Sequence, residues 1–492
     1  MAEPNESRVD MTSGAITPKL FHLAWPLVVG NLLQTAYNLA DMFWVGRVSP
    51  EAVAAVSLMF PTSWLFVSVA MGITAAAVAV VSQHIGAGEE RRAENAVAQT
   101  TLLTLAVAVT LALIGFTIRE PMVWLIGARD AVYDLSLAYI EVIFVAIPFT
   151  FLFFVFRAVL RAAGDTKTAM WLVALSAGLN ILIDPFFVLG QDPLFGFDGL
   201  FLGLGVRGAA IATLISRIFA AFMGIYILLD GGWGIRLRLR DLRPDWPVLK
   251  QLVDIGYPGT IDGLLRSLSA VVLAALVARF GPIVTAAYGI GLRMMSVSWT
   301  VSGAVGQAAA TGVGQNLGSR TPDRAEEVAW KATGGAMAAL FGFGALAFAF
   351  PQAMMRIFIA DAEVIAEGVD FLRIIAFTWA FFGGLMVIQG AFRGAGNTRE
   401  AMALSFLSRW ALRLPLMWVL AFPLAWGAIG LWWGYAVTNV IMFVVGVAWF
   451  RLGGWKEGVT DEEPAEPVGP EEPPEPDGET EPEPDPDTAD DD

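Results

Sequence analysis

Long apolar runs dominate this chain and alternate with short polar connections. The runs have the length that a helix needs to cross a bilayer, about 20 residues, and they are not interrupted by the regular polar face of a soluble helix. The pattern therefore predicts an all-α membrane protein. We expect twelve transmembrane helices, at about residues 19–46, 53–81, 94–117, 132–158, 169–190, 204–229, 250–278, 284–313, 327–350, 364–391, 400–421 and 427–450.

The second half of the chain repeats the first at a fixed offset of 232 residues, from about residue 25 to about residue 170. Gln83-x-x-Gly86 returns as Gln315-x-x-Gly318, and Arg161-Ala-Ala-Gly164 returns as Arg393-Gly-Ala-Gly396. Six helices per copy is an even number, so both copies enter the membrane in the same sense. The repeat thus predicts two pseudo-symmetric six-helix lobes, related by an axis along the membrane normal and separated by a cleft.

The repeat and the local composition divide the chain into five parts. The last of them is rich in Glu and Pro, and residues 461–492 carry 16 Asp or Glu and no Lys or Arg. Such a tail cannot bury apolar surface and is expected to be disordered. The parts are an N-terminal segment, an N-terminal lobe, a linker, a C-terminal lobe and the acidic tail, at residues 1–17, 18–229, 230–249, 250–455 and 456–492.

Basic residues are unevenly shared between the two alternating sets of loops. The richer set includes Arg91, Arg92, Arg393 and Arg399, and it lies on the same side as both ends of the chain. The positive-inside rule therefore predicts that both termini are cytoplasmic. The first helix is too long for a signal peptide, so we expect an uncleaved multi-pass protein of the plasma membrane.

Composition excludes several classes of protein. Hydrophobic residues make up 56% of the chain, Cys is absent and there are two His, so thiolate and His-rich metal sites are not expected. No P-loop and no nucleophile–base set is present, which argues against ATP-driven transport, enzymatic activity and a bound cofactor. The basic stretch at 235–240 lacks interleaved aromatic residues, so no nucleic-acid partner is expected.

Polar residues at membrane depth gather in the first copy of the repeat. Asp41, Asn180 and Asp184 stand where the second copy has leucines, at residues 273, 412 and 416. Ionisable groups inside a membrane are costly and usually functional. Two carboxylates and an amide suit a hard cation or a proton. Each carboxylate taken alone is equally well explained as a residue near a helix end, but the set predicts a site.

The helix at 19–46 carries further polar residues on the same face as Asp41. Gln34, Tyr37 and Asn38 are spaced so that they share this face, and we predict that they line a substrate cavity. Pro26 interrupts the backbone ladder of this helix and is predicted to let it bend. In the second copy Asp262 and Arg266 are four residues apart, and we expect a local ion pair there rather than a substrate contact.

Over about residues 17–452 the chain resembles the multidrug and toxic compound extrusion (MATE) transporters. The residues that carry the resemblance are the segment from Pro18 to Pro26, Asn38-Leu-Ala-Asp41 followed by Val45-Gly46, Gln83-x-x-Gly86, Arg161-x-x-Gly164-Asp-Thr166 and Asn180-Ile-Leu-Ile-Asp184-Pro185. The archaeal and DinF-like branch is the most similar. The resemblance implies a V-shaped pair of six-helix lobes working by alternating access.

The resemblance also implies secondary antiport, in which an organic cation or another amphiphilic compound leaves as H+ or Na+ enters. It assigns the cation site to Asp41, Asn180 and Asp184 with a hydroxyl, for which Thr213 is the candidate. It implies no obligate protein partner, so a monomer surrounded by membrane lipid is expected. A flippase for a lipid-linked precursor is the alternative within the same superfamily, and an intramembrane enzyme is a more distant one. A flippase is expected to have a strongly basic central cavity.

Overall fold

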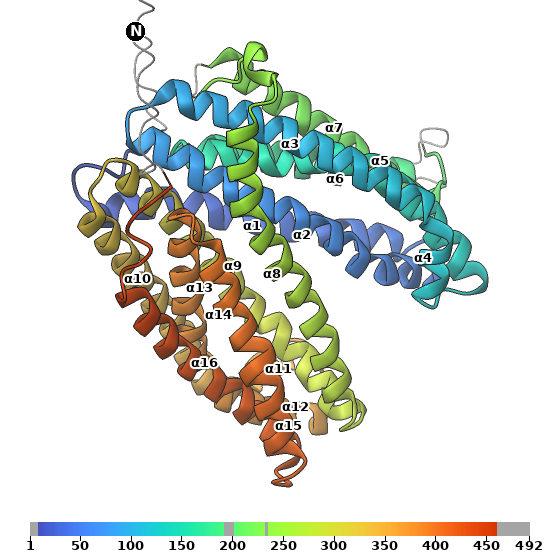
Figure 1. Ribbon diagram of the computed structural model, residues 1–492. Helices are drawn as coiled ribbons and strands as arrows, with labels where there is room; N and C mark the ends of the chain where they lie inside the picture. The colour runs from blue at the N-terminus through green and yellow to red at the C-terminus, as the bar shows by residue number, and fades with distance from the viewer. Residues whose placement is uncertain (1–7, 191–200, 232–234, 460–492) are drawn as a thin grey trace, which may run out of the picture.

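The computed structural model describes residues 8–190, 201–231 and 235–459, and every regular element in these ranges is a helix (Figure 1). The first lobe runs from α1 to α7, and the second from α8 to α16. The helices of the first lobe are α1 (Ile16–Val45), α2 (Pro50–Gly86), α3 (Glu90–Thr117), α4 (Arg119–Leu125), α5 (Asp130–Ala162), α6 (Thr166–Val188) and α7 (Gly205–Asp230). The helices of the second lobe are α8 (Trp246–Ala278), α9 (Pro282–Gly318), α10 (Pro322–Ala349), α11 (Pro351–Arg356), α12 (Ala362–Ile375), α13 (Thr378–Gly394), α14 (Thr398–Phe406), α15 (Leu414–Ala421) and α16 (Gly427–Arg451).

The predicted fold class is confirmed. Eight helices are long and apolar enough to cross a membrane, and α12 with α13 forms a ninth such span that is bent by 55°. Three more long helical segments, α1, α9 and the stretch from α14 to α15, complete six spans in each lobe. The two lobes meet at one end and diverge toward the other, as the arms of a V (Figure 1).

The structure adds detail that hydropathy did not predict. The short helices α4 and α11 follow the third span of each lobe and occupy equivalent positions in the repeat. The span expected at 364–391 is broken between α12 and α13. The span expected at 400–421 contains a π-helical stretch, Leu407–Arg413, between α14 and α15. The linker contains a 3-10 turn at Leu239–Leu242, and the acidic tail beyond residue 459 lies outside the described residues.

The repeated Arg-x-x-Gly-(Asp/Asn)-Thr motif forms a tight turn between two helices. Gly164 and its repeat mate Gly396 have φ of +87° and +90°, a left-handed conformation that glycine adopts at little cost. Asp165 then caps α6, because its carboxylate accepts a hydrogen bond of 3.0 Å from the backbone N–H of Thr168. The Gly-(Asp/Asn)-Thr part of the motif therefore fixes the connection between spans.

The repeated Gln-x-x-Gly motif holds the two lobes together at the closed end of the V. A Cβ added at Gly86 would overlap the carbonyl oxygen of Gln315, and one added at Gly318 would overlap that of Gln83. The Gln83 amide donates to the carbonyl of Gly394 at 3.1 Å, and the Gln315 amide donates to that of Ala162 at 3.3 Å. Ala162 and Gly394 are themselves repeat mates. The close contact of α2 with α9, together with the hydrogen bonds from α2 to α13 and from α9 to α5, forms what we call the lobe junction.

Both ends of the described chain attach to the lobe junction. The backbone N–H of Met11 donates to Oε1 of Gln315 at 2.9 Å, and the Met11 side chain is fully buried. The backbone N–H of Val459 donates to Oε1 of Gln83 at 2.6 Å, and the carbonyl of Val459 accepts from Gln251 at 3.2 Å. Each junction glutamine thus donates from its side-chain amide to the other lobe, and its Oε1 atom accepts from one end of the described chain.

The glycines of the junction are expected to be intolerant of any side chain. Gly318→Ala should push α9 away from α2 and destabilise the protein by about 1–3 kcal/mol, as overpacking does. Gly335→Ala in α10 is the matched control, because an added Cβ there meets no atom within 4 Å and alanine favours a helix. Thermal unfolding of the two purified variants checks this. Equal midpoints for both variants would show that the junction is looser than described.

Residues 462–492 of the acidic tail should be dispensable for stability, whereas its first residues, 456–459, should not. A chain that ends at residue 461 keeps the Val459 contacts and is expected to unfold at the wild-type temperature. A chain that ends at Trp455 leaves the buried Gln83 with an unsatisfied acceptor and should unfold at a lower temperature. Thermal unfolding of both truncated chains is the measurement. An equal fall of the unfolding temperature in both would show that the Val459 contacts do not stabilise the protein.

Candidate functional site

The interior of the first lobe holds a polar group made of Asp41, Asn180 and Asp184, which we call the N-lobe polar group. Asn180 and Asp184 lie one helical turn apart on α6 and have no exposed surface. Asp41 comes from α1, and it lies close enough to Asp184 for their charges to interact. The structure therefore brings together the carboxylates that the sequence analysis selected from two separate helices.

The N-lobe polar group lacks hydrogen-bond partners. Within the described part of the chain, no partner is found for Oδ1 of Asp41, for either side-chain polar atom of Asn180 or for either carboxylate oxygen of Asp184, and all of these atoms are shielded from solvent. Buried polar atoms are normally satisfied, and an unpaired buried carboxylate is strongly destabilising. Several converging oxygen atoms without donors are the surroundings that a proton or a small hard cation requires.

Hydroxyl groups from three helices surround the N-lobe polar group. Tyr37 on α1 and Thr213 on α7 share a hydrogen bond of 2.9 Å between their hydroxyls. Tyr139 on α5 interacts electrostatically with Asp41, Asp184 and Tyr37. Thr213, chosen only from the family resemblance, is therefore in contact with the predicted substrate face of α1. Tyr139 was not predicted, and a scan for tyrosines within the apolar spans would have found it.

Two buried arginines also lie in this lobe and were not predicted. Arg217 on α7 lies over the rings of Phe153 and Tyr37, at 4.4 and 5.4 Å from their centroids, and its guanidinium is 3.4 Å from Oε1 of Gln34. Arg157 on α5 donates to Oδ1 of Asn31 at 2.8 Å. Among the described residues, no carboxylate forms an ion pair with Arg217 or Arg157. Both lie inside predicted spans, and an ionisable side chain at that depth is itself a signal of function.

The remaining predicted residues of α1 differ in their surroundings. Gln34 faces the interior through its contact with Arg217, whereas Asn38 is exposed. Pro26 is buried inside a helix that runs without a break from Ile16 to Val45. Bending at Pro26 remains a prediction. Among the described residues, no three His, Cys, Asp or Glu side chains gather as a metal site, so any bound Na+ would depend on Asn180 and hydroxyl oxygens beside the two carboxylates.

The second lobe holds a different arrangement: the expected ion pair of Asp262 and Arg266 is present, but it is not self-contained. Asp262 accepts from Arg266 at 2.9 Å, but the same Oδ2 atom also accepts from Arg393 at 3.0 Å, and Arg409 lies 3.9 Å from Oδ1. Arg393 and Arg409 are remote in sequence, so helical spacing alone could not reveal them. One carboxylate is thus surrounded by three guanidinium groups.

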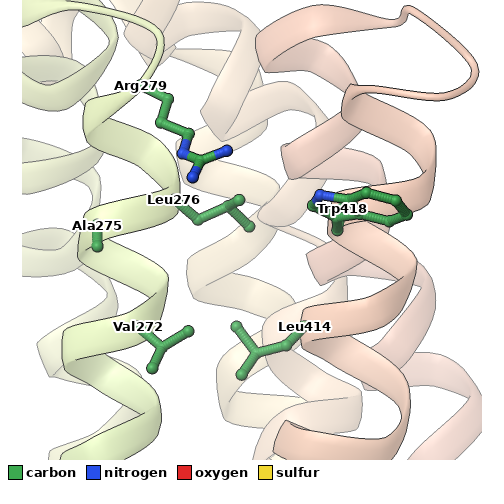
Figure 2. A pocket seen from close by; sticks show the side chains of 6 residues that line it. All are labelled: Val272, Ala275, Leu276, Arg279, Leu414 and Trp418. Atoms are coloured by element: carbon green, nitrogen blue, oxygen red, sulfur yellow. The ribbon is translucent and has the colours of Figure 1, made fainter.

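An apolar crevice of about 340 Å³ lies between α8 and α15 in the second lobe (Figure 2). Figure 2 shows Leu276 and Trp418 facing each other across it, with the Arg279 side chain above Leu276. It is lined by Val272, Ala275, Leu276, Arg279, Leu414 and Trp418. The crevice belongs to the lobe opposite to the N-lobe polar group, so it is not the space that the carboxylates enclose.

Comparisons with known proteins agree with the two-lobed fold. The family model MatE matches residues 26–186 and again 258–419, once in each repeat. The chain is 28% identical over 447 residues to the probable multidrug resistance protein YoeA of Bacillus subtilis, which covers 88% of this chain and 93% of that protein. It is 26% identical over 454 residues to the FAD transporter of Shewanella oneidensis, covering 91% of this chain and 96% of the relative.

A solved structure has the same architecture. It is the outward-facing conformation of a multidrug resistance MATE family transporter of the MOP superfamily, with a TM-score of 0.84, 24% identity and coverage of 92% of this chain and 98% of that one. At this identity the likeness concerns the fold alone. The family match in both repeats carries the assignment: the chain belongs to the MATE family of multidrug transporters and is a membrane transporter rather than an enzyme.

Proposed function

We propose that the protein is a secondary active antiporter that exports amphiphilic compounds, organic cations among them, in exchange for inward-moving H+ or Na+. The observation that carries this proposal is the N-lobe polar group, whose buried oxygen atoms have no partners. The family supplies the transport, and this group supplies a place for the coupling ion. The repeat-related positions in the second lobe are leucines, so a single coupling site in the first lobe is expected.

Coupling requires that the ion bind one conformation of the transporter more tightly than the other. Asp41 and Asp184 lie on α1 and α6, so a proton or Na+ between them relieves their mutual repulsion and draws the two helices together. Tyr37 and Gln34 project from α1 beside this group, so a movement of α1 changes the cavity that they line. Ion binding and substrate binding would then be linked through one helix.

We further propose that the protein lies in the plasma membrane with both termini in the cytoplasm. The loop arginines Arg91, Arg92, Arg393 and Arg399 support this orientation by the positive-inside rule. Both described chain ends attach to the lobe junction at the closed end of the V. With this orientation the V opens toward the outside of the cell, which is the side from which the coupling ion enters and to which the substrate leaves.

A flippase for a lipid-linked precursor is the second candidate, and a specific observation favours it. The arginines around Asp262 make part of the second lobe basic, as expected for a protein that moves an anionic lipid headgroup. The relative from Shewanella oneidensis is named for FAD, which is itself an anion. The first lobe, with its two unpaired carboxylates, favours an ion-coupled antiporter instead, and we retain antiport as the proposal.

Removing either carboxylate should abolish coupling without unfolding the protein. Asp41→Asn and Asp184→Asn are expected to fold but to lose gradient-driven efflux, because the neutral amide cannot hold the ion in place of a carboxylate. Asn180→Ala should weaken efflux less, since a neutral ligand contributes less to ion binding. Efflux of a fluorescent cationic dye from proteoliposomes, with H+ and Na+ gradients imposed in turn, is the measurement.

The matched control is Leu416→Asn on α15, which creates an amide at the position equivalent to Asp184 in the other lobe. Its efflux should stay close to that of the wild type, with protein amount and monodispersity equal for all variants. Near-normal efflux by both Asp→Asn variants under every imposed gradient would rule out the first lobe as the coupling site, whatever the family.

Variants of the Tyr37–Thr213 pair can distinguish a structural role of their hydrogen bond from a role of Thr213 as an ion ligand. Tyr37→Phe and Thr213→Val both break the 2.9 Å bond between the hydroxyls, so a purely structural role predicts equal effects. If the Thr213 oxygen coordinates Na+, Thr213→Val should lower Na+-driven efflux at least about tenfold more than Tyr37→Phe, a difference of about 1.4 kcal/mol. H+-driven efflux should fall equally in the two variants. If the two variants lose Na+-driven efflux equally as well, Thr213 is not a ligand of Na+.

A further inference from the structure

The second lobe contains an arginine cluster, made of Arg266, Arg393 and Arg409, that converges on Asp262 from three helical segments. Arg266 comes from α8, Arg393 from the end of α13 and Arg409 from the π-helical stretch after α14. The Asp262 side chain is 6% exposed, whereas the arginine side chains keep 37%, 27% and 17% of their surface exposed. The acid is thus enclosed, and the guanidinium groups around it are partly open.

The arginine cluster is not neutralised by the groups around it. Asp262 is the only carboxylate that forms an ion pair with these arginines among the described residues. Arg413, four residues beyond Arg409, adds a further positive charge. Its partners are neutral, because it donates to Oδ1 of Asn439 at 2.8 Å and lies 3.9 Å over the ring of Tyr435. Excess positive charge within membrane spans is costly unless an anion compensates it.

The guanidinium groups also have donors to spare. Each guanidinium has five N–H donors in a planar fork that fits a phosphoryl or carboxylate group. In the described contacts, Arg266 and Arg393 each use a single nitrogen to bind Asp262, and Arg409 uses a single nitrogen to bind Oγ of Ser405 at 2.6 Å. Asp262 therefore orients two of the arginines while leaving most of their donors free for another oxyanion.

The apolar crevice of Figure 2 lies nearer the C-terminal end of α8 than Asp262 and Arg266 do. On α8, Asp262, Leu265, Val272 and Leu276 follow at spacings that keep them on one helical face. Nε1 of Trp410 donates to the carbonyl of Leu265 at 3.1 Å, which ties this face of α8 to the π-helical stretch that precedes α15. Arg266 and Arg409 thus lie earlier in the chain on α8 and on the π-helical stretch, and later residues of α8 and α15 line the crevice.

We propose that the arginine cluster binds the anionic group of an amphiphilic substrate, a phosphoryl or carboxylate group, and that the crevice between α8 and α15 accepts its apolar part. That the ligand is transported rests on the function proposed above, but its binding does not require an ion gradient. Asp262 acts as a positioning residue, since it holds the guanidinium groups and does not itself bind the anion. An organic cation is repelled by this region.

The proposal is tested by the binding of two ligands with the same tail and opposite charge. The full chain is placed in nanodiscs of phosphatidylcholine and titrated with octyl phosphate or with octyltrimethylammonium, and tryptophan fluorescence and the unfolding midpoint are followed. Octyl phosphate should bind saturably and raise the midpoint, whereas octyltrimethylammonium should not. Arg266→Gln and Arg409→Gln should each weaken octyl phosphate binding at least about tenfold, the effect of losing about 1.4 kcal/mol.

Arg399→Gln is the matched control, because Arg399 is exposed on α14, stacks on Tyr257 and lies outside the cluster. It should leave binding unchanged. A cluster that only stabilises the fold predicts no saturable binding by the wild type and no difference between the two ligands. Either of these results overturns the proposal.

The source of the anion is identified in the same discs. Displacement of octyl phosphate when phosphatidylglycerol replaces part of the phosphatidylcholine shows that a lipid headgroup occupies the cluster. If inorganic phosphate displaces octyl phosphate and phosphatidylglycerol does not, a soluble anion occupies the cluster. Octyl phosphate binding is measured at equilibrium without an ion gradient, and efflux is measured with one, so loss of the anion site in the second lobe and loss of coupling in the first can be told apart.

Discussion

The close crossing of α2 and α9 is the constraint on which the rest of the structure depends. Gly86 and Gly318 let each helix approach the backbone of the other, and Gln83 and Gln315 bind across the contact. Because the lobes are fixed at this end, their other ends can diverge and leave the interior of each lobe open to different chemistry. The chain ends bind the same glutamines, so the junction is satisfied on all sides without a ligand.

The two lobes share a backbone plan but arrange their buried charges differently. The first encloses two carboxylates without partners, and the second encloses one carboxylate among three arginines. A proton or metal cation is attracted to the first environment and an oxyanion to the second. In the function proposed above, the duplicated fold divides two tasks between its copies: one lobe binds the coupling ion and the other binds a charged group on the cargo.

The sequence was sufficient for the architecture because the repeat and the apolar runs are strong signals. It was weaker where contacts join residues far apart in the chain. The pairing of Asp262 with Arg266 follows from helical spacing, but Arg393 reaches the same oxygen from 131 residues away. Arg217 lies within a predicted span, but its partners Tyr37 and Gln34 come from α1, so its contacts could not be predicted from its own helix. Hydropathy did not reveal the bend in the tenth span or the π-helical stretch in the eleventh.

The reciprocal contacts of the lobe junction have a further consequence. When residue i contacts residue j and the equivalent of j contacts the equivalent of i, the interface is isologous, as in a homodimer with twofold symmetry. Gln83 with Gly394 and Gln315 with Ala162 meet this condition. Each half of the chain therefore displays a self-complementary surface, and a single six-helix unit would already carry the contacts needed to pair with a copy of itself. The linker makes this pairing intramolecular and leaves each half free to diverge in sequence.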